Sequence, residues 1–405
     1  TYYLNLFLIF SNIFLLKKIL TIVFNKTNIF LVGNGKIGHY PSNIFIAKQL
    51  YDSNSIFVHK IGVNKVDGIQ LFFENKYLYK KCIENFNFDQ SYEKIYYMNL
   101  ALSFLSFNIY KINIFPETLH MTKELNFADA FDGKSTIFDF NENENDSGQK
   151  YLEKHELKKN KYVCFILRTN EYYDSINLGC RNQKMEFRNV DPSNYFPTIS
   201  YLIKEGYKVI RMGKNTKEIF PYNDSNFIDY ATSEYRSDFL DIWLSANCKF
   251  TLSSDLGLGC LPMVFNKPFL FADFFPLGRM LSFVPKSIHL PRIAYLNNKI
   301  MTLKEMIETD VIYKIDGQFY SKLGIKVLDN SSEDILNATK EMLENIEKYF
   351  NITPLNKIFW ENLNAKWNSY LYSKNATTLY RKELFFKYSK DKINFEHFHK
   401  INGIK

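Results

Sequence analysis

Cysteine is scarce in this chain, and its spacing follows no metal-binding or redox motif. The 405 residues include 5 cysteines, none of them in a C-x-x-C pair: Cys82, Cys164, Cys180, Cys248 and Cys260. An odd number of cysteines without that spacing argues against a disulfide framework and against a structural zinc site. We therefore expect a protein of a reducing compartment that holds no metal, with Cys164 and Cys248 as ordinary buried side chains.

Other familiar signatures are missing as well. The chain has no H-E-x-x-H motif, no G-x-S-x-G motif and no P-loop lysine motif. Metalloprotease, serine-hydrolase and P-loop NTPase chemistry therefore have no support. A strong charge is missing too, because a net charge of +8 is modest for this length. It suits a phosphate-bearing ligand or an anionic membrane surface, and we expect no nucleic-acid partner.

No apolar run reaches the roughly 20 residues that a membrane-spanning helix needs. Residues 2–16 are nearly all apolar, but Lys17 and Lys18 follow them. The segment also lacks a small-residue cleavage site, which argues against a signal peptide. We expect residues 1–27 to form an apolar segment whose helix lies on a membrane surface, with its lysines at the headgroups. A buried helix of the first domain is the alternative.

The length of the chain and its apolar content of 46% indicate two domains, each with its own core. Residues 141–148 contain no apolar side chain, which is typical of a linker. Residues 331–334 have the pattern of a helix-capping box, and Ile335, Met342 and Ile346 recur on one face of the helix that follows. After the segment 1–27 we expect a first domain, a linker, a second domain and a helical extension, over residues 28–140, 141–160, 161–330 and 331–405.

The first domain begins with a strand, a helix and a strand, which we expect over residues 29–32, 41–50 and 55–59. The loop after the first strand has the glycines of a dinucleotide-binding fingerprint, Gly33-x-Gly35-x-x-Gly38. A bulky His39-Tyr-Pro follows them, and no acidic residue ends the second strand. We therefore expect a loop that admits a substrate, and no nicotinamide or flavin cofactor.

His39 lies at the end of that glycine loop. An imidazole there could act as a general base on an acceptor hydroxyl, because its pKa lies near the working pH. A histidine that only hydrogen-bonds the turn is the alternative.

In the second domain, cationic side chains stand where strands end. Strands over 162–167 and 207–211 flank a helix with Asp191 as its N-cap, Pro192 in its first turn and Gly206 at its end, which makes a right-handed βαβ unit. A second unit runs from a helix over 237–246, through a strand over 249–252, to a strand over 269–272. Ligands of open α/β sheets bind beyond the carboxyl ends of the strands. Arg168 and Arg211 are placed there, and guanidinium groups suit phosphate oxygens.

Three further features belong to this pattern. Arg188 could join the other arginines at a phosphate. Ser253-Ser254-Asp255-Leu-Gly257 follows a strand, so that its hydroxyls and N–H groups could bind an anion at a helix start, with simple helix capping as the alternative. Asp229 and Asp238 could hold a ribose or sugar hydroxyl, or could only orient the arginines.

Several of these motifs together resemble a family of glycosyltransferases associated with bacterial surface-carbohydrate biosynthesis. The similarity spans residues 29–290 and is strongest over 163–273. It is carried by short motifs that include Ile37-Gly-His39, Arg188-Asn, Val209-Ile-Arg-Met-Gly213, Asp229-Tyr-Ala231, Ser237-Asp238, the Ser253–Gly257 turn and Phe265-Asn-Lys-Pro268.

The resemblance implies an α/β fold of the GT-B type, in which two Rossmann-like domains face each other across a cleft, here followed by C-terminal helices. It implies a metal-independent transferase without a cofactor, which takes a nucleotide-sugar donor in the second domain and a carbohydrate or lipid-linked acceptor in the first. The protein would be cytoplasmic, at the inner membrane. By this resemblance His39 lies near the acceptor, and the donor site comprises Arg168, Arg188, Arg211, Gly213, Asp229, Ser253, Ser254 and Gly257.

Two other functions remain open at this point. One is a sugar-nucleotide epimerase, which uses a similar donor site but transfers nothing. The other is a non-catalytic module that binds carbohydrate or lipid in an envelope complex.

Overall fold

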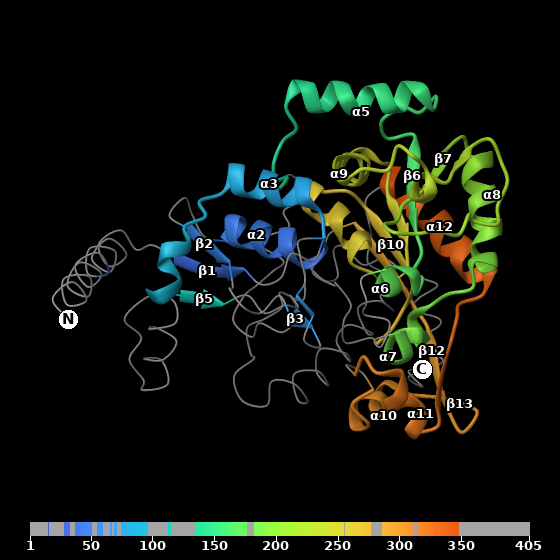
Figure 1. The fold of residues 1–405 in the computed structure, drawn as a ribbon. Coiled ribbons are helices and arrows are strands. Elements are labelled where there is room, and N and C mark those ends of the chain that lie inside the picture. Colours follow the sequence, from blue (N-terminus) through green and yellow to red (C-terminus); the bar gives the residue numbers. More distant parts are fainter. Residues whose placement is uncertain are drawn as a thin grey trace. The chain divides into compact units, whose positions relative to one another are not determined.

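The structure is a computed structural model of the 405-residue chain. It describes residues 15, 28–32, 37–50, 55–59, 65–66, 69–70, 74–95, 112–114, 135–175, 182–254, 256–276, 286–311 and 314–347. The expected membrane-surface helix, the glycines Gly33 and Gly35, Asp255 and the tail after residue 347 lie outside these residues. The chain divides into two compact units, Thr1–Thr122 and Lys123–Lys405, whose elements are labelled in Figure 1.

The first unit contains a parallel sheet in the order β2-β1-β5. Its elements are β1 (Asn28–Val32), α2 (His39–Leu50), β2 (Ser55–His59), β3 (Lys65–Val66), β4 (Ile69–Gln70), α3 (Lys76–Asn85), η1 (Gln90–Tyr92) and β5 (Ile112–Ile114). The expected strand–helix–strand beginning is confirmed. The helix begins at His39, before Pro41, because a proline in the first turn loses no intrahelical hydrogen bond.

The second unit is built on a six-stranded parallel sheet. Its strands are β6 (Tyr162–Ile166), β7 (Lys208–Arg211), β8 (Phe227–Ile228), β9 (Thr251–Ser253), β10 (Phe269–Phe274) and β11 (Ser287–Pro291). The order across the sheet is β11-β10-β9-β6-β7-β8. The chain thus starts in the middle, moves outward to β8, and returns to the other side of β6 with β9. The α/β class with parallel sheets is confirmed.

Helices cover both faces of this sheet (Figure 1). One face packs against α8 (Phe196–Lys204) and α12 (Ser332–Glu347), which lie side by side. Val163 and Phe165 of β6 belong to that core, whereas Tyr162 faces the other way and its hydroxyl donates to the Leu244 carbonyl of α9 (Asp238–Asn247) at 2.9 Å. This alternation along a fully buried strand is what period-two side-chain direction requires.

The helix boundaries follow local signals in the sequence. Asp191 caps the 3-10 turn η6 (Pro192–Tyr195), which continues into α8, and Gly206 has a φ of 81° directly after that helix. Only glycine adopts this backbone without strain, so it ends the helix as expected. The Ser237 hydroxyl accepts the Leu240 N–H at 3.1 Å and caps α9, and the Ser331 hydroxyl accepts the Asp334 N–H at 3.1 Å in front of α12.

Residues 141–160, which we expect to be a linker, contain α5 (Glu142–Lys154). Asn141 and Glu144 form a complete capping box, so the polar run is helical although it lacks an apolar face. At Gly148 the helix lies so close to Trp243 of α9 that an added Cβ would be 2.2 Å from the indole ring. The packing of α5 therefore depends on a glycine that, in the sequence, looks like a linker residue.

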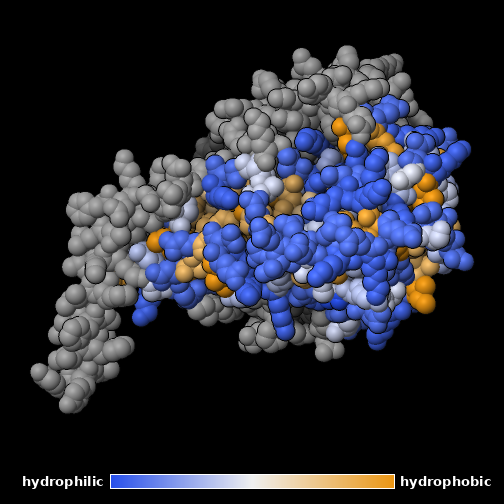
Figure 2. Space-filling model, turned by 90° about the horizontal axis from the view of Figure 1, so that it is seen from above, coloured by the Kyte–Doolittle hydropathy of each residue, from blue (hydrophilic) through white to orange (hydrophobic). Residues whose placement is uncertain are grey.

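The remaining elements are short. They are α6 (Glu171–Ser175), α7 (Asn182–Met185), η5 (Glu186–Arg188), η7 (Tyr230–Thr232), η8 (Gly257–Phe265), β12 (Ile293–Leu296), β13 (Lys299–Ile300), α10 (Leu303–Glu308), α11 (Gly317–Lys322) and β14 (Ile325–Leu328). The last strands form an antiparallel sheet in the order β13-β12-β14. Hydrophilic side chains predominate on the face drawn in Figure 2. Among the described residues, no helix combines the length and the apolar character needed to cross a membrane.

Candidate functional site

The strand order of the second unit contains one reversal, and it lies between β6 and β9. Counted in chain order, the six strands have the arrangement 3-2-1-4-5-6, which is the arrangement of dinucleotide-binding α/β folds. In such sheets the connections from the two central strands leave toward opposite faces, which opens a crevice beyond their carboxyl ends. The residues that follow β6 and β9 are therefore the first candidates for ligand contact.

Arg168 follows β6, Ser254 follows β9, and the structure joins them directly. The backbone N–H of Arg168 donates to the Ser254 hydroxyl at 2.8 Å, and the backbone N–H of Ser254 donates to the Ile166 carbonyl at 2.9 Å. Arg168 is 8% exposed and Ser254 is fully buried. We call this pair of hydrogen bonds the switch-point contact. Two residues expected in the donor site are thus brought together, 86 positions apart in the chain.

The neighbouring serine and glycine have roles inside the fold. The Ser253 hydroxyl donates to the Ser254 carbonyl at 2.6 Å, and a Cβ added at Gly259 would lie 2.3 Å from the Ser253 oxygen. Gly257 begins η8, a 3-10 helix with Pro262 inside it and no side-chain cap at its start. The segment after β9 therefore leads into a 3-10 helix and not an α-helix, and the Ser254 hydroxyl accepts the Arg168 N–H.

Arg211 and Asp229 also lie together, as an ion pair at the carboxyl ends of β7 and β8. Arg211 Nη1 is 2.9 Å from Asp229 Oδ2 and also donates to the Glu218 carbonyl at 2.9 Å. The same carboxylate oxygen accepts the Phe220 N–H at 2.9 Å, and the guanidinium lies 5.2 Å from the Phe220 ring centre. These contacts close the loop between the two strands. They match the alternative in which Asp229 orients an arginine.

Gly213 lies in that loop and makes a close approach. An added Cβ would be 3.0 Å from the Thr216 hydroxyl and 3.1 Å from the Ala231 methyl group. A larger residue would therefore push the loop away from η7. Gly213 shapes the turn that carries the next residue, Lys214.

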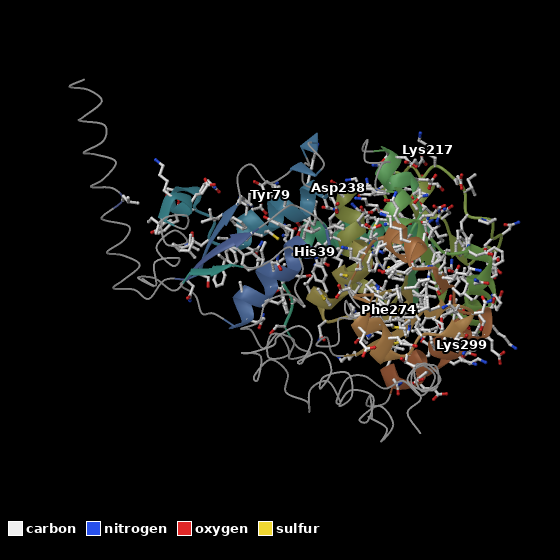
Figure 3. All side chains as sticks on the ribbon, turned by 90° about the horizontal axis from the view of Figure 1, so that it is seen from below. His39, Tyr79, Lys217, Asp238, Phe274 and Lys299 are labelled. Carbon is white, nitrogen blue, oxygen red and sulfur yellow. The ribbon has the colours of Figure 1, made fainter. Side chains whose placement is uncertain are left out.

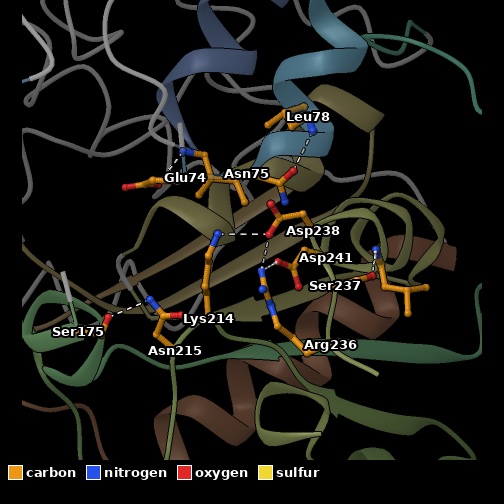
Figure 4. A network of polar contacts seen from close by, with 12 residues as sticks. Glu74, Asn75, Leu78, Ser175, Lys214, Asn215, Arg236, Ser237, Asp238 and Asp241 are labelled. Atoms are coloured by element: carbon orange, nitrogen blue, oxygen red, sulfur yellow. Dashed lines mark hydrogen bonds and ion pairs between the residues drawn. The ribbon is translucent and has the colours of Figure 1, made fainter. Parts of the chain in front are cut away.

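Asp238, one of the expected candidates, lies in a charged cluster whose other members, Lys214, Arg236 and Asp241, were not expected (Figure 4). Lys214 Nζ lies 3.2 Å from Asp238 Oδ1, and Arg236 contacts the same oxygen at 2.9 Å. Arg236 also pairs with Asp241, whose other oxygen accepts the Tyr230 hydroxyl at 3.0 Å. Lys214 and Asp238 keep 30% and 21% of their side chains exposed. They can therefore reach a ligand, whereas Asp241 is only 2% exposed.

Burial raises the pKa of Asp241 to about 6, although Arg236 acts in the opposite direction. Asp238, labelled in Figure 3, is the first residue of α9, where carboxylates are favoured by the helix dipole. The sequence pattern alone could have indicated this cluster. Lys214 directly follows the glycine of the strand-end motif, and Arg236-Ser-Asp238 precedes a capped helix.

Arg188 lies in a segment that Arg292 holds in place. The Arg292 guanidinium donates to the carbonyl oxygens of Phe187 and Asn189, and it pairs with Asp273 at 3.7 Å and with Asp329 at 3.1 Å. Arg292 follows β11 and is 2% exposed. Arg292 thus contacts residues about 100 positions earlier in the chain, such as Asn189, which lies 103 positions before it. No local sequence pattern could have indicated it.

The Arg188 segment is also tied to the connection after β6. The Asn189 amide donates to Asn170 Oδ1 at 3.0 Å, and the Arg188 guanidinium lies 3.9 Å from the Met185 sulfur. Arg188 and Arg168 are therefore carried by connections that bond to each other at the carboxyl edge of the sheet.

In the first unit, His39 is the first residue of α2, and Figure 3 labels it. The Ile37 N–H in front of it donates to Glu74 Oε2 at 2.8 Å, which anchors the end of the glycine loop. A second histidine, His59, ends β2, and its Nε2 lies 3.1 Å from the Tyr40 hydroxyl. Its ring stacks on Phe88 with centroids 4.5 Å apart. Burial lowers the pKa of His59 to about 4, so this ring is neutral at pH 7.

Within the described ranges, no group of three histidine, cysteine, aspartate or glutamate side chains could hold a metal ion.

No protein-family model matches the chain, and no curated protein sequence does either. Among solved structures, a glycosyl transferase of family 9 from Veillonella parvula DSM 2008 is 10% identical with a TM-score of 0.42, over 79% of this chain and 97% of that chain. E. coli ADP-heptose LPS heptosyltransferase II is 12% identical with a TM-score of 0.42, over 79% and 100%. E. coli heptosyltransferase WaaC with ADP is 12% identical with a TM-score of 0.31, over 65% and 91%. These scores are too low to carry an argument, so the proposals below rest on the residues of this chain.

Proposed function

We propose that this chain is a metal-independent glycosyltransferase of the GT-B type. It would move a sugar from a nucleotide-sugar donor to an acceptor hydroxyl in the synthesis of a surface polysaccharide or glycoconjugate. The observation that carries the proposal is the switch-point contact, which places Arg168 at the reversal of a 3-2-1-4-5-6 sheet. The motif resemblance described above supports glycosyl transfer as the reaction.

The donor would bind at the carboxyl edge of the second unit. A nucleotide in this type of sheet lies across the point where the strand order reverses. Arg168 would contact the diphosphate, because a guanidinium can bind two phosphate oxygens at once. Lys214 and Asp238, which are partly exposed beyond β7, would reach the diphosphate and a ribose hydroxyl. Ser254 would act through Arg168, by holding its backbone.

In the reaction, the acceptor oxygen bonds to the anomeric carbon, and the bond from that carbon to the diphosphate oxygen breaks. The nucleoside diphosphate leaves with the electron pair, so negative charge develops on the diphosphate. Arg168 would stabilise that charge, because a cation fixed in advance needs no reorganisation as the charge forms. His39 of the first unit would accept the proton of the acceptor hydroxyl.

The donor site can be tested with Arg168→Ala and a panel of nucleoside diphosphates and nucleotide sugars. The alanine keeps the backbone N–H that bonds Ser254, so it removes the guanidinium and leaves the switch-point contact in place. Lys204→Ala is the matched control, because Lys204 is exposed at the opposite edge of the sheet. We expect a nucleotide to raise the Tm of wild type and the control, but not of Arg168→Ala. Turnover of a competent donor should fall by about 100-fold or more.

Two outcomes would replace the proposal with another function. Epimerised nucleotide sugar formed without any acceptor would identify a sugar-nucleotide epimerase. Absence of thermal stabilisation by every nucleotide would favour a non-catalytic module that binds carbohydrate or lipid. Unchanged nucleotide binding in Arg168→Ala would show that the ligand lies elsewhere on the chain.

A further inference from the structure

The amino ends of the strands in the second unit carry a series of lysines. Because all six strands are parallel, their starts lie together at the edge opposite to the switch-point contact. A lysine begins or closely precedes five of the strands: Lys161 before β6, Lys208 in β7, Lys249 before β9, Lys267 before β10 and Lys286 before β11. Lys159 lies two positions before Lys161.

Carboxylates are missing from most of this edge. Residues 158–161, 247–250, 266–268 and 286–287 contain no aspartate or glutamate. Lys208 differs, because its ammonium lies 3.6 Å from Glu156. Among the described residues, Lys159, Lys267 and Lys286 have no carboxylate partner. The lysines without a carboxylate partner therefore lie just before β6, β10 and β11.

Hydrogen bonds link the segments that carry these lysines. Lys267 Nζ donates to Asn160 Oδ1 at 2.8 Å, and the Asn160 N–H donates to the Asn247 carbonyl at 3.0 Å. The Phe269 N–H donates to the Lys286 carbonyl at 3.3 Å, which holds Lys286 beside the start of β10. Lys159 Nζ lies 5.1 Å above the Trp243 ring.

The charges of these lysines influence one another. Burial lowers the pKa of the Lys267 ammonium, Cys248 and Cys164 act in the opposite direction, and the charges of Lys286 and Lys159 lower it to a smaller extent. Lysines gathered without a counter-charge repel one another, and that repulsion opposes folding. An anion bound among them would remove the repulsion. The arrangement therefore favours a bound anion over three independent surface cations.

We propose that Lys159, Lys267 and Lys286 form a binding site for a phosphate-bearing anion at the amino edge of the sheet. Each ammonium is a compact charge with several donors, which suits phosphate oxygens approached from different directions. The five residues of β6 separate this edge from the switch-point contact by roughly 17 Å at 3.3 Å per residue. The anion therefore binds independently of a nucleotide at the other edge. It comes either from a phospholipid headgroup or from a soluble polyphosphate.

The test compares Lys159→Gln/Lys286→Gln with Lys322→Gln/Lys326→Gln in the full chain. Both double variants remove two positive charges, and the control lysines are exposed in α11 and β14. One arm measures binding of inorganic tripolyphosphate by calorimetry. The other measures co-sedimentation with phosphatidylglycerol vesicles, with phosphatidylcholine vesicles as the neutral reference. Thermal unfolding of each variant confirms that it is folded.

We expect the Lys159/Lys286 variant to lose about 30-fold in affinity in one of the two arms, since each lysine contributes about a fivefold factor at an anionic surface. The control should lose less than threefold. Loss in the vesicle arm identifies a headgroup, and loss in the tripolyphosphate arm identifies a soluble ligand. Equal binding by the two double variants, or no binding by wild type in either arm, would overturn the proposal. Neither result depends on nucleotide binding at Arg168.

Discussion

The ion pair between Arg211 and Asp229 should contribute more to folding than to catalysis. Arg211 is 6% exposed, and one of its nitrogens serves both Asp229 and the Glu218 carbonyl. Replacing it with methionine keeps a long side chain beside Phe220 but leaves the carboxylate without its cation. Breaking a buried ion pair in this way costs about 3–5 kcal/mol. Because Asp229 keeps 16% of its side chain exposed, we expect a loss near the lower end, about 3 kcal/mol.

The double variant Arg211→Met/Asp229→Asn should recover part of this loss, because no uncompensated charge remains. The asparagine oxygen can still accept the Phe220 N–H, which the aspartate accepts at 2.9 Å. The two single variants and the double variant therefore form a cycle, which isolates the coupling between the two side chains.

Urea unfolding followed by tryptophan fluorescence measures these free energies. Lys204→Met serves as the control, with an expected change within about 0.5 kcal/mol, as for an exposed side chain without special contacts. The reasoning fails if Arg211→Met unfolds within about 1 kcal/mol of wild type but no longer binds a nucleotide. Arg211 would then be a ligand-binding residue, and the contacts with Asp229 would have little structural weight.

Two further predictions concern packing and pH. Gly148→Ala should lower the free energy of unfolding by about 1–3 kcal/mol, because its Cβ would overlap Trp243 and α5 must shift; unchanged urea unfolding would mean that α5 does not pack there. For His59, burial lowers the pKa from 6.5 to about 4, so the folded protein binds this proton less readily than the unfolded chain. Stability is then full above pH 6.5 and is lost as the pH falls toward 4. His59→Gln should have a Tm that falls less than that of wild type between pH 7 and pH 5, and parallel curves would contradict the assignment.

The parallel sheets and several helix boundaries could be predicted from the sequence because their signals are local. Asp191-Pro192, Gly206 and Ser237 each fix one helix end through a cap or a φ value that needs no distant partner. The location of the residues that follow the strands could also be predicted, because parallel strands bring their carboxyl ends to one edge of the sheet. This is why Arg168 and Ser254, chosen from separate motifs, lie in direct contact.

Other parts of the candidate site depend on contacts that local patterns do not contain. Lys214 pairs with Asp238, 24 positions later, and Arg292 holds a backbone segment more than 100 positions earlier. Polarity alone indicated a linker at residues 141–148, but the capping box and the fit of Gly148 against Trp243 make a packed helix. The helix expected after Ser254 is a 3-10 helix with Pro262 inside it, a residue that disrupts α-helical hydrogen bonding.

The strand order also determines when the switch-point contact can form during folding. β6 pairs with β7 after the connection from Ile166 to Lys208, but its other partner, β9, begins only at Thr251, after β7, β8 and α9 have been traversed. Closing a longer loop costs more chain entropy before any contact rewards it, so the β6–β8 half should assemble first. The amides of Arg168 and Ser254 should then gain protection from hydrogen exchange later in refolding than those of β7. A chain arrested at that half-sheet would contain every strand on one side of the reversal but would lack the switch-point contact.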